Sequence, residues 1–323
     1  MKAILYDAPG DPDVLYWGET DDPQPGSDDL LVRVRATAVN RAELLQRRGG
    51  YPPPPGASPI LGLELVGEVV QAAGRWNVGD RIMAVVTGGA YAELAVVPAA
   101  VAMPVPRGMP AEQAAAIPEA FLTAFLNLFT LGRLQAGETV LIHAGASGVG
   151  TAAIQLARTV GARVFATASA GKLALCRSLG AEAIDYRSTQ FDRQVLEATG
   201  GHGADVILDF VGAPNWAPNM AALAGRGRLM LIGFLGGSQG NLDLGAIMAK
   251  SLTVTGTTLR RTPLDMKARL AADFAAFALP RFENGELRPV IDRVLPIAEA
   301  AQAHQLMESN RNAGKIVLLF GPS

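Results

Sequence analysis

The stretch from Thr139 to Gly161, TVLIHAGASGVGTAAIQLARTVG, constrains the fold of this chain most. It combines an apolar strand, a glycine-rich turn and an amphipathic helix that ends at a glycine. Gly145, Gly148 and Gly150 let the backbone turn where a side chain would collide with a ligand. The free amides at the start of the helix then face an anion. This order of elements predicts a site for the pyrophosphate of a dinucleotide.

The residues after the next expected strand, Arg163 to Thr167, indicate which dinucleotide binds. The sequence ASAGK at 168–172 lies about 20 residues beyond the turn, where NAD enzymes place an acid on the ribose. Here Ser169 leaves room for a 2′-phosphate and the Lys172 ammonium would neutralise it, which predicts NADPH. The alternative for Lys172 is an ordinary exposed lysine. Asp185, the nearest later acid on an apolar strand, is assigned to the next unit.

Length and charge narrow the class of protein. The 323 residues allow two domains, and the net charge of −2, from 28 basic and 30 acidic residues, favours neither nucleic acid nor an anionic membrane as partner. The apolar stretches are interrupted by Gly, Pro or charge before they reach the length of a membrane span. The start, MKAILYDAPGD, lacks a secretory signal. We therefore expect a soluble cytoplasmic protein.

Cysteine and histidine are too few for most zinc sites. The single cysteine, Cys176, excludes an internal disulfide and a four-cysteine site, and the three histidines, His143, His202 and His304, lie far apart in the sequence. We expect chemistry without a metal. Cys176 is interpreted as a small apolar helix residue, and His143 as a packed or hydrogen-bonded structural residue.

The pattern along the chain predicts an α/β protein with two domains. Residues 1 to about 115 alternate short β-type runs with Gly and Pro, which predicts a largely antiparallel β domain. Within it, a short helix over Asn40 to Arg48 precedes Tyr51 and the stiff run Pro52 to Pro55. The expected strands of this part are Lys2 to Tyr6, Leu30 to Ala38, Leu65 to Gln71, Arg81 to Val86 and Tyr91 to Val97.

From about Ala111 to Thr130 the apolar spacing becomes helical, and βα units then repeat. Such a series predicts a doubly wound parallel sheet of about six strands. These strands are expected near Val140, Val164, Ile184, Val206, Leu229 and Val254. The remainder ends in a helix over Ala298 to Met307 and a last strand, Lys315 to Phe320, which we expect to fold back onto the N-terminal domain.

The outer strand of that sheet, Leu252 to Thr258, contains neither charge nor proline that would block pairing with another strand. An unguarded edge predicts a two-fold homodimer in which the sheets join at this strand. The alternative is a loop of the same chain that covers the edge.

Four motifs carry a resemblance to the medium-chain dehydrogenase/reductase superfamily. Within it, the chain resembles the zinc-free, zeta-crystallin-like quinone oxidoreductases, most closely the branch of the tumour-suppressor-inducible quinone oxidoreductase. The motifs are AVNRAELLQRRGGYPPPPGAS at 38–58, ILGLELVG at 60–67, HAGASGVGTAAIQLAR at 143–158 and GKIVL at 314–318. The resemblance implies a GroES-like (chaperonin-10-like), mainly β catalytic domain at 1–119 and 263–323. It also implies a Rossmann domain at 120–262, with NADPH meeting a quinone in a cleft between the two.

The resemblance bears on zinc and on the register of the glycine turn. Positions that bind catalytic zinc in related alcohol dehydrogenases carry Asn40, Leu63 and Glu119, and leucine cannot bind zinc. Aligning Gly145 and Gly150 to the superfamily puts Ser147 at the middle glycine, where it would hold the phosphate farther from the helix or donate a hydrogen bond to it. The rival register uses Gly148, Gly150 and Ala153; we prefer the first.

By the same resemblance, Asn40, Thr123 and Tyr51 are candidate catalytic residues, with Asn40 and Thr123 near the nicotinamide and Tyr51 beside the substrate. Asn40 has an alternative role as a helix cap, and Tyr186 as simple packing. The expected cofactor-binding residues are Asn40, Thr123, Gly145, Ser147, Gly148, Val149, Gly150, Ser169, Lys172, Tyr186, Phe234 and Leu259.

The implied activity is hydride transfer from NADPH to a quinone or related conjugated carbonyl. The protein would contribute mainly alignment, and a hydrogen bond from Asn40 or Tyr51 would stabilise charge on the acceptor oxygen. Either Tyr51 or water would supply the proton, and one-electron and two-electron reduction both stay open. The alternatives are enoyl-thioester reduction and a non-catalytic NADPH sensor.

Overall fold

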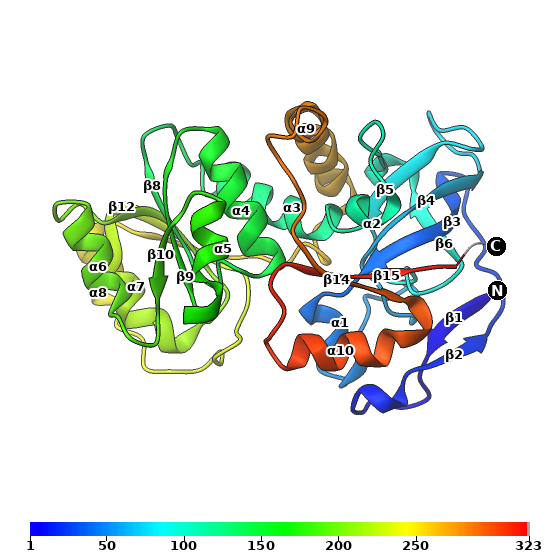
Figure 1. Cartoon of the computed structure of the whole chain (residues 1–323), viewed down its shortest axis with the longest axis horizontal. Helices are drawn as coiled ribbons and strands as arrows, with labels where there is room; N and C mark the ends of the chain where they lie inside the picture. Colours follow the sequence, from blue (N-terminus) through cyan, green and yellow to red (C-terminus); the bar gives the residue numbers. More distant parts are fainter. Residues whose placement is uncertain (322–323) are drawn as a thin grey trace. The chain divides into compact units, whose positions relative to one another are not determined.

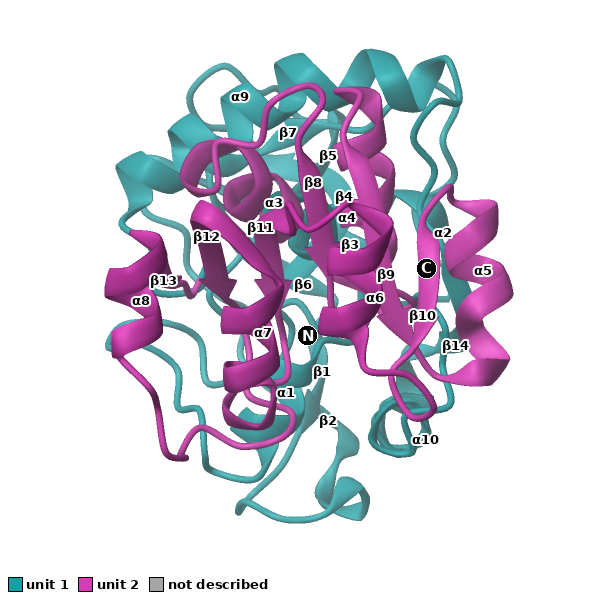
Figure 2. Cartoon of the chain, turned by 90° about the vertical axis from the view of Figure 1, so that its left-hand side faces the viewer, with its two compact units in different colours: residues 1–122, 259–323 teal, residues 123–258 magenta. Residues whose placement is uncertain are grey.

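The computed structural model describes residues 1–321, which form two compact units (Figures 1 and 2). Unit 1 comprises Met1–Leu122 and Leu259–Ser323, and unit 2 comprises Thr123–Thr258. The sequence analysis placed these boundaries at 119/120 and 262/263. The middle of the chain therefore forms one unit, and the two ends of the chain together form the other.

Unit 2 is built on a six-stranded parallel sheet, as predicted. Its strand order is β10-β9-β8-β11-β12-β13, so the order reverses between β8 and β11, as in doubly wound folds. The strands are β8 (Thr139–Ile142), β9 (Arg163–Ala168), β10 (Glu182–Asp185), β11 (Ala204–Asp209), β12 (Leu223–Leu231) and β13 (Thr253–Gly256). The α-helices along this part are α4 (Gly148–Thr159), α5 (Leu173–Ser178), α6 (Phe191–Ala198), α7 (Trp216–Ala222) and α8 (Gly245–Lys250).

Burial explains why the strands of unit 2 read as continuous apolar runs. Val140, Leu141 and Ile142 of β8 have no exposed surface, because a parallel sheet is covered on both faces. One core cluster joins Leu141 to Val195 of α6 and to Met220 of α7. This packing holds the carboxyl ends of the strands, where the glycine turn begins, on a rigid base.

Unit 1 contains a seven-stranded mixed sheet and a small two-stranded sheet. The order is β14-β15-β3-β4-β5-β7, with β6 also paired to β3; β1 pairs with β2. The strands are β1 (Lys2–Leu5), β2 (Tyr16–Glu19), β3 (Asp29–Ala38), β4 (Glu64–Gln71), β5 (Arg81–Val85), β6 (Leu94–Pro98), β7 (Met103–Pro104), β14 (Ile291–Pro296) and β15 (Lys315–Leu319). β15 lies antiparallel to β3, so the end of the chain folds back onto the N-terminal β domain as expected.

The α-helices that belong wholly to unit 1 are α1 (Arg41–Arg47), α2 (Ala111–Ala114), α9 (Leu264–Glu283) and α10 (Ala300–Glu308). The sequence analysis missed α9, although the buried residues Leu270, Phe274 and Ala278 recur every four positions. Its last turn contains Pro280, a residue that usually marks the end of a helix. The sequence therefore contains a clear signal for this helix.

The apolar region before the glycine turn forms α3 (Pro118–Phe125), which continues as a π-helix, η3 (Leu126–Leu131). Within residues 1–321, Ala111–Leu131 is the one helical stretch that is long and apolar enough to cross a membrane, and 78% of it is buried inside the protein. A single, mostly buried stretch is weak evidence for a span, because core helices share these properties. The predicted cytoplasmic location stays a prediction.

Candidate functional site

The glycine turn of unit 2 requires glycine at two positions. A Cβ on Gly145 would lie 2.7 Å from the Ala166 Cβ on the neighbouring strand β9. On Gly150 it would lie 2.3 Å from the backbone oxygen of Ala144. Both contacts are shorter than van der Waals distance, so the helix α4 can approach the strands only because these side chains are absent. This geometry favours the register that contains Gly145 and Gly150.

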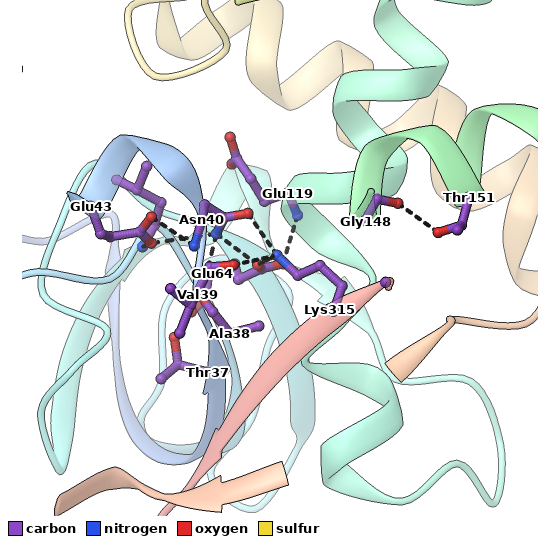
Figure 3. Close-up of polar contacts among 12 residues, drawn as sticks. Thr37, Ala38, Val39, Asn40, Glu43, Glu64, Glu119, Gly148, Thr151 and Lys315 are labelled. Atoms are coloured by element: carbon purple, nitrogen blue, oxygen red, sulfur yellow. Dashed lines mark hydrogen bonds and ion pairs between the residues drawn. The ribbon is translucent and has the colours of Figure 1, made fainter. Parts of the chain in front are cut away.

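Ser147, which stands where related proteins have the middle glycine, is the N-cap residue of helix α4. Its Oγ accepts a hydrogen bond of 3.0 Å from the Gly150 backbone N–H, which is an N-cap interaction. The Thr151 hydroxyl in turn donates to the Gly148 carbonyl oxygen at 2.9 Å (Figure 3). Ser147 therefore occupies one amide of the helix start, while its own O–H remains a donor for an anion.

The predicted 2′-phosphate residues follow the end of β9. Ser169 begins the short 3₁₀ helix η4 (Ala170–Lys172), and its carbonyl accepts from the Lys172 backbone N–H at 2.8 Å. Ser169 and Lys172 are half-buried. Tyr186, after β10, is 52% exposed, and the Arg187 guanidinium lies 5.7 Å from its ring centre.

Asp185 lies nearer to the end of β9 than its sequence position indicated. It is the register partner of Ala168 at the end of the adjacent strand, although the sequence analysis set it aside as part of the next unit. One of its carboxylate oxygens accepts from the Arg187 backbone N–H at 3.1 Å. The acid is thus engaged in its own turn, and the sheet brings it beside the strand that ends at Ser169.

Thr123 and Phe234 are in unit 2 but in different environments. Thr123 is buried, and its carbonyl accepts from the Asn127 side chain at 2.8 Å. Asn127, which the sequence analysis did not single out, also accepts from the Thr257 hydroxyl at 3.0 Å. Phe234, after β12, is 55% exposed. Asn127 lies in the π-helix η3, and the spacing of apolar residues could not predict this local backbone geometry.

His143 is a buried structural residue, as predicted. Its Nδ1 lies 2.9 Å from the Thr167 hydroxyl and its Nε2 lies 2.8 Å from the Asn219 side-chain oxygen. Burial lowers its pKa, despite the nearby Asp209 carboxylate. The imidazole therefore stays neutral and holds two strands and helix α7 together. Cys176 is also buried, which raises its pKa to about 11 and keeps the thiol unreactive.

In unit 1, a buried polar cluster surrounds Asn40 (Figure 3). Lys315 of β15 donates to the Asn40 side-chain oxygen at 2.6 Å and forms an ion pair with Glu64 of β4 at 2.7 Å. The side chains of Glu64 and Lys315 are 0% and 5% exposed. The other Glu64 oxygen accepts from the Glu119 backbone N–H at 2.8 Å. The cluster thus ties β4, β15 and the start of α3 together.

The amide of Asn40 is directed into this cluster. Its Nδ2 group donates to Glu64 at 2.9 Å and more weakly, at 3.3 Å, to Glu43 and the Ala38 carbonyl. The Asn40 backbone N–H donates to Glu43 at 3.0 Å, which stabilises the start of α1. The helix-start alternative is therefore observed, and a hydrogen bond from Asn40 to nicotinamide stays a prediction.

Three glutamates share one lysine in this cluster. Burial raises the pKa of Glu43 to about 7 and that of Glu119 to about 8. Lys315 lowers the pKa of Glu43 more than Glu64 raises it, whereas at Glu119 the carboxylates of Glu64 and Glu43 outweigh Lys315. Glu43 accepts from the Leu63 backbone N–H at 3.1 Å. The cluster thus holds carboxyl groups that change charge near neutral pH.

The three positions aligned with zinc ligands lie around this cluster. Leu63 is buried and offers no ligand atom, the Asn40 side-chain oxygen accepts a hydrogen bond from Lys315, and Glu119 donates its backbone N–H to Glu64. Within residues 1–321 no three His, Cys, Asp or Glu side chains are grouped in a way that could hold a metal. Zinc independence stays a prediction.

Tyr51 and Leu259 complete the predicted residues of unit 1. Tyr51 is half-buried, and its backbone oxygen accepts from Arg260 at 3.3 Å. Burial raises the pKa of the Tyr51 hydroxyl, so it stays protonated at neutral pH. Leu259 is 7% exposed. The predicted site residues are thus divided between the two units.

Comparison with known families identifies the class of protein. A model described as alcohol dehydrogenase GroES-like domain matches residues 26–107, and one described as zinc-binding dehydrogenase matches residues 148–276. The chain belongs to the medium-chain dehydrogenase/reductase superfamily, and both the GroES-like and the Rossmann prediction are confirmed. Within that superfamily it is an oxidoreductase. It is 37% identical to a quinone oxidoreductase of Pseudomonas aeruginosa, over 98% of this chain and 99% of that protein.

Solved structures share the whole fold. A mycobacterial structure complexed with NADPH has a TM-score of 0.90 and 32% identity, covering 99% of this chain and 100% of that one. A structure titled as an NAD-dependent alcohol dehydrogenase has a TM-score of 0.88 with the same identity and coverage. The enoyl reductase JamJ has a TM-score of 0.88 and 26% identity, covering 99% of each chain. These relatives support a nicotinamide cofactor for the family.

Proposed function

We propose that this protein transfers hydride from NADPH to a quinone or a related conjugated carbonyl. The observation that carries the proposal is the end-to-end similarity to a quinone oxidoreductase, on a chain whose glycine turn and acid-free end of β9 suit a phosphorylated dinucleotide. NADPH, when bound, supplies the hydride. The protein itself binds the two reactants, orients them and excludes water from them.

The residues of unit 2 fit the phosphates of such a cofactor. The Ser147 hydroxyl and the amides of Gly148 and Val149 stand at the start of α4, where the helix dipole favours an anion. The half-buried Ser169 and Lys172 suit a 2′-phosphate. Asp185 at the adjacent strand end opposes such a phosphate, and its bond to the Arg187 backbone N–H offsets part of that charge.

For unit 1 we propose a role without zinc. Leu63 replaces a ligand, and the ammonium of Lys315 occupies the cluster that a dication would otherwise need. Tyr51 retains its proton at neutral pH and is the candidate donor to the acceptor oxygen, with water as the alternative. Asn40 serves as a fixed dipole, held by Lys315.

A panel of acceptors tests this proposal. Oxidation of NADPH and of NADH is measured with ortho-quinones, para-quinones and crotonyl thioesters as acceptors. We expect turnover of quinones with NADPH at a kcat/KM at least about tenfold above that with NADH. Turnover of the thioester alone would instead support enoyl reduction, which the likeness to the enoyl reductase favours as second candidate. No turnover of any acceptor would leave a binding role.

We also propose a homodimer that forms through β13. This strand ends the order of the sheet and pairs only with β12 within the described residues. Thr253 on it is exposed, so Thr253→Lys adds a charge to the edge. We expect light scattering to show a dimer that becomes monomeric in this variant. The control Thr189→Lys, at an exposed site away from the edge, should stay dimeric, and a monomeric wild type would contradict the proposal.

A further inference from the structure

We propose that Arg260, Arg261 and Lys267 form a binding site for an anionic group, such as a carboxylate or sulfonate, carried by an aromatic acceptor. The three cations belong to unit 1 and line one groove together with the loop Pro52–Pro55. The role of the ligand as a hydride acceptor rests on the proposed function, whereas the binding of an anion does not.

Arg260 is a buried cation that has no counter-ion among residues 1–321. It is 6% exposed, and its guanidinium donates only to neutral oxygens. The acceptors are the Thr87 carbonyl at 2.8 Å, the Gln46 side-chain oxygen at 2.8 Å and the Tyr51 carbonyl at 3.3 Å. No carboxylate within residues 1–321 comes within 4.0 Å of it. Buried charges are normally paired, so an unpaired one points to a missing anion.

Two further cations, Arg261 and Lys267, lie close to Arg260 and retain N–H groups that can donate hydrogen bonds to a ligand. The Arg260 and Arg261 guanidinium carbons lie 5.2 and 6.0 Å from the centre of the Tyr51 ring. The half-buried Lys267 donates to the Arg260 carbonyl at 2.9 Å, which uses one of its three N–H groups. Neither Arg261 nor Lys267 has a carboxylate within 4.0 Å among the described residues. Two guanidinium groups thus lie beside one aromatic ring, and the Lys267 ammonium contacts the backbone of Arg260.

The groove has room for an aromatic ligand. Its volume is about 1220 Å³, and prolines 52–55 give it a stiff, apolar wall. Two aspartates, Asp21 and Asp29, also line it, but neither forms an ion pair with the three cations. An apolar wall beside unpaired cations suits a ligand with a flat apolar body and one negative group.

The charges around the three cations agree with this assignment. Burial lowers the pKa of both Arg260 and Lys267, because it removes water from their charged groups. The acids that act on Lys267 and Arg260 from a distance include Glu119 and Glu43, whose own pKa values burial raises to about 8 and about 7. These acids therefore carry little negative charge at pH 6.5, and a ligand anion would supply it.

Equilibrium binding tests the site without turnover. Isothermal titration compares anthraquinone-2-sulfonate with the neutral 2-(hydroxymethyl)anthraquinone on the full chain. We expect the sulfonate to bind about tenfold more tightly at low salt, a preference that falls as salt rises. Arg261→Gln and Lys267→Gln should each weaken sulfonate binding about threefold to tenfold and leave the neutral probe unchanged. Glutamine at 267 keeps a donor for the Arg260 carbonyl.

The matched control is Arg269→Gln, an exposed arginine on the same helix α9. Its sulfonate affinity should equal that of the wild type. The proposal is overturned if both probes bind the wild type equally, or if Arg269→Gln lowers sulfonate affinity as much as Arg261→Gln does. It is also overturned if the Arg261 and Lys267 variants lose both probes together while circular dichroism shows an intact fold.

These titrations, combined with the turnover of the acceptor panel, distinguish a failure of the anion site from a failure of the proposed function. A sulfonate preference that Arg261→Gln removes, in a protein that turns over no quinone, supports the anion site and refutes the quinone reductase. Turnover of neutral quinones without any sulfonate preference would support the quinone reductase and refute the anion site. Arg260 is not used as a test residue, because its loss would also release Tyr51, Gln46 and Thr87.

Discussion

The glycine turn of unit 2 and the Asn40 cluster of unit 1 are two polar sites built in opposite ways. The turn is made by neighbours in sequence, from Gly145 to Thr151, and its chemistry is mostly that of the backbone. The cluster joins side chains of Asn40, Glu64 and Lys315, with 251 residues separating the last two. A local site depends on shape, whereas a dispersed site depends on the balance of buried charges.

The largest expected effect comes from filling the turn. Gly150→Val places carbon 2.3 Å from the Ala144 carbonyl oxygen and 2.8 Å from the Gly145 backbone, so α4 must move away. We expect NADPH affinity, measured by fluorescence titration, to fall by about 100-fold or more. Gly171→Ala is the control, because a Cβ there meets nothing within 4 Å. Equal loss in both variants would contradict a purely steric role.

The cluster is tested by removing its cation. Lys315→Met leaves Glu64 buried without its partner, which should lower the free energy of unfolding by about 3–5 kcal/mol in urea titrations. The double variant Lys315→Met with Glu64→Leu should recover much of that loss, because no unpaired charge remains. Absence of recovery would show that packing rather than charge dominates this site.

A smaller effect is expected at the cofactor's ribose. Lys172→Glu reverses the charge after β9, so the ratio of NADPH to NADH affinity should fall about tenfold. Arg177→Glu, on the exposed side of α5, is the matched control. An unchanged ratio in Lys172→Glu would remove this residue from 2′-phosphate recognition.

The smallest effect concerns the pH dependence of stability. Glu119 has a pKa of about 8 in the folded protein, above its ordinary value of 4.5, so the folded state holds the proton more tightly. Its contribution is complete below pH 4.5 and is lost as pH rises to about 8. Since the Glu119 side chain is half-buried and water screens part of this effect, we expect only about 1 kcal/mol. Urea titrations of Glu119→Gln should therefore show a shallower fall in stability between pH 5 and pH 8, and an unchanged slope would refute this.

Much of unit 2 was predictable because its signals are local. The apolar run at Val140 to Ile142, the glycines after it and the recurring βα units predicted the parallel sheet of about six strands that is observed. Contacts between neighbouring strands were harder to predict from the sequence. Asp185 lies beside Ala168 only because β10 and β9 pair in register, a fact that residue spacing could not show.

Local sequence was therefore sufficient for the strand-turn-helix unit, its glycine requirement and the absence of an acid after β9, since these depend on backbone geometry between near neighbours. The cluster around Asn40, the raised pKa of Glu119 and the unpaired charge of Arg260 depend on folding. Each arises when residues far apart in the chain lose water together, and the free energy of a charge depends on which partners then surround it.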